Sequence, residues 1–88
     1  MSDHRNKQRK SPDAVMLTKA RLKKGYSQQH IALLSGVALR HYQRIEYGER
    51  PFSALSIRQG LLICIILDID PFEITFGKEN LPDTTVSR

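Results

Sequence analysis

The stretch from Ser27 to Tyr47 limits the possible folds more than any other part of the chain. Ser27 can accept a backbone N–H of a first helical turn, and the residues at 31–34 are all apolar. Gly36 follows soon after them, and glycine readily takes the left-handed conformation that ends a helix. From Val37 to Gly48 the spacing of apolar residues is helical again. The stretch therefore predicts two short helices joined by a tight turn.

The second of these predicted helices has two different faces. On one side, at helical spacing, lie Ala38, His41, Tyr42 and Ile45, which we expect to pack inward. The other side carries a mostly polar set with two arginines: Leu39, Arg40, Gln43, Arg44 and Tyr47. A helix with such an open face can enter the major groove of DNA. Helix, glycine-containing turn and polar-faced helix together form a helix-turn-helix pattern.

Residues 21–50 resemble the Cro/repressor helix-turn-helix family (XRE family) of bacterial and phage regulators. The matching elements, in chain order, are Arg21, Gly25, Ser27-Gln28, Ile31-Ala32, Ser35-Gly36-Val37, Ile45-Glu46, Gly48 and Arg50. A looser likeness extends the match to roughly residues 13–76. The resemblance implies an all-α, five-helix domain like that of lambda repressor, with the helix-turn-helix at its second and third helices.

The resemblance also implies roles for the exposed side chains. Arg40 and Arg44 lie one turn apart, and each could donate two hydrogen bonds to a guanine, while Leu39 could lie against a thymine methyl group. Gln43 and Tyr47 could reach a base edge or a phosphate. The remaining DNA contacts, to backbone phosphates, are expected from Ser27, Gln28 and Arg50.

Two further expectations concern how the recognition helix is held. An inward-facing Arg21 needs a partner, and the family resemblance suggests Glu46, so we predict a structural ion pair between them. The family usually has Ser or Thr at the start of the recognition helix, where this chain has Ala38. Alanine cannot cap a helix, which leaves a backbone donor free for water or DNA.

Capping signals predict the other helices. Ser11 and Pro12 open a helix that runs to Lys24 and ends at Gly25. A fourth helix is expected from about Ala54 to Leu67, with Ser53 as its cap. Asp70 and Pro71 open a fifth helix that reaches about Phe76 and ends at Gly77. The domain is therefore expected over residues 11–77, between a disordered basic arm (1–10) and a flexible tail (78–88).

Charge is distributed unevenly along the chain. Residues 1–50 hold eleven Lys/Arg against four Asp/Glu, whereas residues 51–88 hold three against five. The basic half contains the helix-turn-helix, as expected for a part that meets a polyanion. The same asymmetry would arise if a basic arm and a lysine-rich helix only kept the chain soluble. For the arm itself, a solvated terminus is the favoured interpretation over a contact with phosphates.

The apolar run at 61–67 indicates a second partner. A helix that is apolar on every side must be covered on every side, and so small a domain can cover only one. We therefore predict a homodimer whose interface uses Ile63, Ile66, Leu67, Ile69, Phe72 and Phe76. The alternative is a protein-interaction module, such as an antitoxin that covers a toxin with its fourth and fifth helices. The two can both hold, because antitoxins often bind their own operators.

The sequence gives little support to other functions. Cys64, the only candidate nucleophile, lies in the apolar run and lacks a visible acid–base pair, so we expect no enzyme activity. We expect no metal or other cofactor, because the chain has no metal-ligand cluster and no glycine-rich phosphate loop. The N-terminus lacks a signal-peptide segment, and the longest apolar run is too short to span a bilayer. We therefore predict a cytoplasmic repressor that binds double-stranded DNA.

Overall fold

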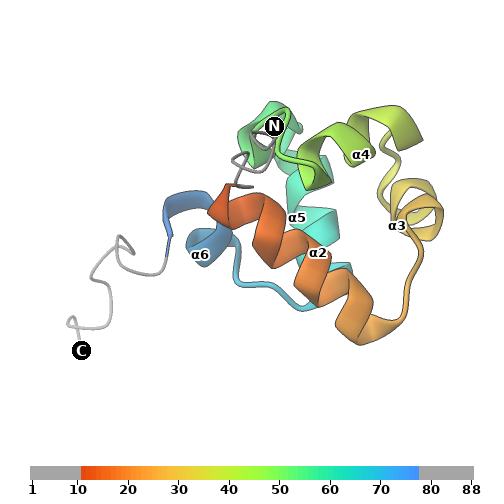
Figure 1. Ribbon diagram of the computed structural model, residues 1–88, viewed down its shortest axis with the longest axis horizontal. Helices are drawn as coiled ribbons and strands as arrows, with labels where there is room; N and C mark the ends of the chain where they lie inside the picture. The colour runs from red at the N-terminus through yellow and green to blue at the C-terminus, as the bar shows by residue number, and fades with distance from the viewer. Residues whose placement is uncertain (1–10, 78–88) are drawn as a thin grey trace, which may run out of the picture.

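The computed structural model describes residues 11–77, and all its regular elements in that range are helical (Figure 1). They are α2 (Pro12–Lys24), α3 (Gln28–Ser35), α4 (Leu39–Glu46), the 3₁₀ turn η1 (Phe52–Ala54), α5 (Ile57–Leu67) and α6 (Pro71–Phe76). The five-helix, all-α prediction is confirmed. The predicted basic arm (1–10) and flexible tail (78–88) lie outside the described residues.

Local capping explains where α2, α3 and α6 begin and end. The Ser27 hydroxyl oxygen accepts the backbone N–H of His30 at 3.0 Å, and the Ser11 and Asp70 side chains likewise cap α2 and α6. Gly25 and Gly36 end α2 and α3 at φ +81° and +74°, a left-handed conformation that favours glycine. The boundaries predicted for α2 and α6 from these signals are confirmed.

The start of α5 differs from the prediction. Ser53 lies within η1 and caps nothing, whereas Ser56 accepts the N–H of Gln59, whose side chain accepts the N–H of Ser56 in return. This reciprocal capping box satisfies two donors and sets the start of α5 at Ile57. The 3₁₀ turn instead lets Phe52 pack against α5. A Cβ added at Gly60 would lie 3.3 Å from the Phe52 ring, so the glycine makes room for this contact.

The core lies where α2, α3, α4 and α5 meet, with α6 closing one end beside α2 (Figure 1). Its fully buried side chains include Leu17, Ile31, Tyr42, Ile45 and Ile63, one or two from each of those four helices. Burying a side chain of this size contributes roughly 1.5–3 kcal/mol. Because Tyr42 and Ile45 belong to α4, core packing fixes which face of α4 remains outside.

Candidate nucleic-acid interface

The inner side of α4 is held by a buried carboxylate. Glu46 is 1% exposed and lies in the last turn of α4. Arg21, from α2, donates to both of its oxygens, with Nε 2.7 Å from Oε2 and Nη2 3.0 Å from Oε1. The third guanidinium nitrogen of Arg21 donates to the Tyr26 carbonyl at 2.9 Å. A bidentate pair of this kind fixes the angle between two helices as well as their distance.

Two further donors complete the surroundings of this carboxylate. The Tyr42 hydroxyl donates to Oε2 at 2.6 Å, and the Gln28 amide donates to Oε1 at 2.8 Å. Burial alone would raise the pKa of Glu46, but the hydrogen bonds from Arg21, Tyr42 and Gln28 outweigh it and hold the pKa below its ordinary value. Burial, followed by the hydrogen bond to Glu46, raises the pKa of Tyr42. Glu46 is therefore ionised at neutral pH and acts only as an acceptor.

Arg21 and Glu46 are paired in the structure, and the Gln28 side chain is bound to the same carboxylate. This side chain was predicted to reach a phosphate, whereas in the structure its amide nitrogen is directed at Glu46. Its amide oxygen accepts from Nε2 of Gln43 at 3.2 Å. No short motif in the sequence marks these pairs, because the residues are 18 and 15 positions apart and meet only when α3 packs on α4.

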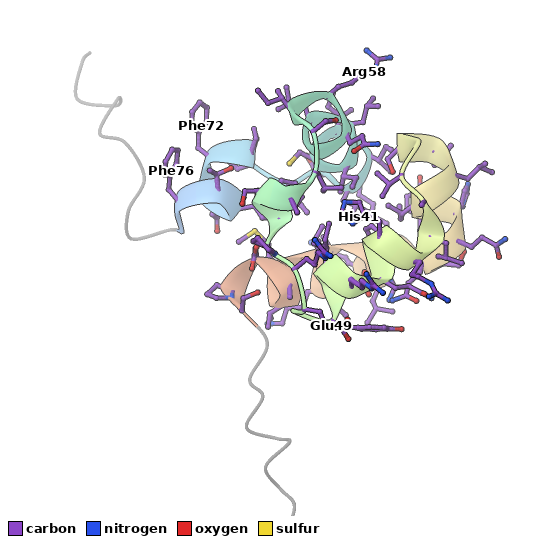
Figure 2. All side chains as sticks on the ribbon, turned by 90° about the horizontal axis from the view of Figure 1, so that it is seen from above. His41, Glu49, Arg58, Phe72 and Phe76 are labelled. Carbon is purple, nitrogen blue, oxygen red and sulfur yellow. The ribbon has the colours of Figure 1, made fainter. Side chains whose placement is uncertain are left out.

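The outer side of α4 presents the side chains predicted to meet DNA. Arg40 and Arg44 are exposed, Leu39 and Tyr47 are 37% and 51% exposed, and Gln43 is half-buried. Neither arginine has an ion-pair partner among residues 11–77. His41, which was expected to pack inward, is half-buried and lies on the side of α4 that faces the rest of the domain (Figure 2). Two unpaired guanidinium groups therefore project from a helix whose other side is fixed.

The other residues predicted to contact DNA or to affect those contacts lie before and after α4 in the chain. Ala38 makes no side-chain hydrogen bond at the start of α4, as its sequence predicts. After α4, Gly48 adopts φ +85°, and the N–H groups of Glu49 and Arg50 bond back to the carbonyl of Arg44 at 2.8 and 3.3 Å. This turn leaves the Arg50 side chain exposed. Ser27 is exposed too, although its hydroxyl oxygen is engaged in capping α3.

The residues predicted to form a dimer interface separate into two groups. Ile63, Leu67 and Ile69 are at most 9% exposed and belong to the domain's own core, so they have almost no surface to offer a second subunit. Ile66 is partly buried against the same core. Phe72 and Phe76 are 57% and 47% exposed, and their rings stack with centroids 6.5 Å apart (Figure 2).

The apolar residues that α5 does expose were missed in the sequence. They are Ile57, Leu61 and Ile65, which are 82%, 45% and 75% exposed. Their spacing of four puts them on one stripe of the helix, beside the buried Gly60, Cys64 and Leu67. The spacing of four was the available signal, but where every residue of a run is apolar the sequence does not show which face is buried.

Burial raises the pKa of the Cys64 thiol to about 11, with a smaller effect of Asp70, so Cys64 is protonated at neutral pH.

Comparison with known proteins gives one match. A family model described as helix-turn-helix covers residues 17–73, about two thirds of the chain. No curated protein and no solved structure matches the chain. The matched region contains α3, α4 and the Glu46 carboxylate with all its donors. Among the described residues, no helix has both the length and the apolar character needed to cross a membrane.

Proposed function

We propose that this chain, which belongs to the Cro/C1-type helix-turn-helix family of DNA-binding regulators, is a repressor that recognises a specific double-stranded sequence with the outer face of α4. One observation carries the proposal: Arg40 and Arg44 are exposed and unpaired within residues 11–77, on a helix held by a buried carboxylate. Bidentate pairing of arginine with guanine needs such a rigid support. A bound domain excludes other proteins from the DNA that it covers, which is the action of a cytoplasmic repressor.

In this proposal, different residues contact the bases and the backbone phosphates. Arg40 and Arg44 read base edges in the major groove, with Leu39 and Tyr47 beside them. Arg50 and the backbone N–H groups of the first turn of α3, at Ser27 and Gln28, meet backbone phosphates and set the register. Phosphate contacts contribute affinity for every sequence, whereas base contacts contribute the differences between sequences.

Replacing Arg40 with alanine tests the assignment of base contacts. Arg40→Ala is expected to reduce discrimination at one base pair per half-site by about 1–3 kcal/mol, because a bidentate pair with guanine is lost. The measurement is competition binding against duplexes changed at single positions. Arg58→Ala is the matched control, since Arg58 is also exposed but lies on α5, across the molecule from Glu49 in the loop after α4 (Figure 2). Unchanged sequence preference in Arg40→Ala would show that α4 does not read bases.

We also propose that the regulator is a homodimer, with the exposed stripe of α5 and the α6 rings as its interface. Ile57, Ile65, Phe72 and Phe76 are each about half exposed or more, on two helices that contact each other. An apolar surface of this kind in a small domain marks an interaction site. Dimeric binding would place two copies of α4 one helical turn of DNA apart.

The dimer predicts a specific change in mass. At high micromolar concentration, light scattering is expected to give twice the chain mass for the wild type and the single-chain mass for Phe72→Ser/Phe76→Ser. Leu33→Ser on α3 serves as control, because Leu33 is 77% exposed but belongs to neither α5 nor α6. A monomeric wild type would contradict the dimer. If such a monomer instead co-purified with a small protein through the same residues, the antitoxin-like alternative would be favoured.

A further inference from the structure

We propose that Gln28 is a positioning residue that fixes the orientation of the Gln43 side-chain amide, so that α4 presents a hydrogen-bond acceptor to the base opposite Gln43. The inference rests on the proposed function, because it concerns how the outer face of α4 reads a base pair. It also assigns Gln28 a role different from the phosphate contact of its side chain that the sequence suggests.

The chain of hydrogen bonds begins at the Glu46 carboxylate, which can only accept hydrogen bonds. Glu46 is ionised, is 1% exposed, and can only accept. Gln28 approaches it at 2.8 Å and must therefore turn its NH₂ group toward the carboxylate. The opposite orientation would place the Gln28 oxygen against the carboxylate oxygens and leave a buried acceptor facing another acceptor, which is costly. The orientation of Gln28 is thus fixed by chemistry rather than by space.

Gln28 in turn fixes the orientation of the Gln43 side-chain amide. With its NH₂ group turned to Glu46, Gln28 presents its amide oxygen to Gln43. Gln43 meets this oxygen at 3.2 Å with Nε2, the only donor of its side chain. The Gln43 amide is thereby fixed in turn. Its Oε1 has no hydrogen-bond partner among the described residues, and one N–H of its Nε2 is also left over.

The remaining groups of Gln43 match one base better than the others. Adenine offers an N6 donor and an N7 acceptor in the major groove, which suit the free oxygen and the remaining N–H. Guanine offers two acceptors, O6 and N7, so its O6 would face the Gln43 oxygen. A glutamine that could turn freely would tolerate guanine by rotating its amide. We therefore expect adenine over guanine opposite Gln43, with the preference set by Gln28.

The test compares two glutamines that are neighbours on α3. Gln28→Met removes both hydrogen bonds of the Gln28 amide and leaves Glu46 with its donors from Arg21 and Tyr42, so the domain should stay folded. Gln29→Met is the matched control, since Gln29 is exposed on the same helical turn. Thermal unfolding monitored by circular dichroism checks that both variants are folded.

The readout is relative affinity for duplexes that differ at one base pair. That pair is identified as the position where Gln43→Ala loses its preference. There the wild type and Gln29→Met are expected to prefer adenine over guanine about five- to tenfold, and Gln28→Met less than about twofold. The proposal is overturned if Gln28→Met weakens all duplexes equally and keeps the adenine preference. A wild type with no preference at any position would instead overturn the proposed function, and this is seen before any variant is compared.

Discussion

Replacing Arg21 with methionine is expected to lower the free energy of unfolding by about 3 kcal/mol or more. The Glu46 side chain is 2% exposed and the Arg21 side chain 12%, so the substitution leaves a charge buried without its main partner. Small domains are stable by only about 5–15 kcal/mol, so the loss would be a large part of the total.

Urea unfolding of Arg21→Met beside Arg40→Met measures this effect. Both variants lose one arginine, but Arg40 is exposed and unpaired among residues 11–77, so its loss should change stability by less than about 0.5 kcal/mol. At permissive temperature, Arg21→Met should keep the wild-type sequence preference, because Arg21 acts through α4 and touches no base. Equal stability of the two variants, or a preference altered more than the stability, would refute the structural role of the pair.

The contribution of Glu46 to stability should change with pH in opposite directions in the wild type and in Arg21→Met. In the wild type, the pKa of Glu46 lies below its ordinary value of 4.5, so stability from the ionised carboxylate is present above that pH and lost below it. In Arg21→Met, burial favours the protonated acid, and the deficit relative to wild type should shrink as the pH falls. A constant difference between the two proteins from neutral pH to pH 4 would argue against the buried charge as its cause.

The second large expected effect is a steep fall of DNA affinity as the salt concentration rises. The proposed dimer meets phosphates through Arg50 and the α3 N-terminal turn of each subunit, and each neutralised phosphate releases counterions. If the dimer neutralises about six phosphates, affinity should fall roughly a thousandfold between 50 and 200 mM salt. Arg50→Ala in both subunits should reduce the salt slope by about 2, one for each lost contact, without changing the preferred sequence.

Fluorescence anisotropy with one labelled duplex, titrated at several salt concentrations, measures the slope for both proteins. Glu49→Gln is a useful comparison, since the neighbouring residue loses a negative charge rather than a positive one. Its affinity should rise slightly at low salt. An affinity that hardly depends on salt would contradict a phosphate-binding surface on this side of the domain.

The boundaries of α2, α3 and α6 could be predicted from sequence because local chemistry sets them. Ser27 and Gly36, for example, cap α3 with groups only a few residues away. The start of α5 was misplaced by three residues, since both Ser53 and Ser56 can cap a helix. What decided between them was the packing of Phe52 on Gly60 together with the Gln59 side chain.

The parts of the site that could be predicted were those marked by the family pattern, such as the Arg21–Glu46 pair, or by helical spacing. Arg40 and Arg44 lie on the exposed face of α4, as their helical spacing indicates. The hydrogen bonds from Gln28 to Glu46 and from Gln43 to Gln28 could not be predicted, because the spacing of residues within one helix does not determine which side chains of a second helix they meet. The residues predicted for the dimer interface divide for a related reason: Ile63, Leu67 and Ile69 are buried in the core, whereas Phe72 and Phe76 are exposed. Ile63 and Ile65 are chemically alike, and only the packing of α5 decides that Ile63 is buried and Ile65 is exposed.

The central claim is that the outer face of α4 reads base edges, and selection of bound sequences from a random duplex pool tests it most directly. We expect the wild type to enrich one motif at both low and moderate salt, with two related half-sites about one helical turn apart. The same selection with Arg40→Ala/Arg44→Ala should recover duplexes without that motif. Failure of the wild type to enrich any sequence, or recovery of the same motif by the double variant, would contradict the account.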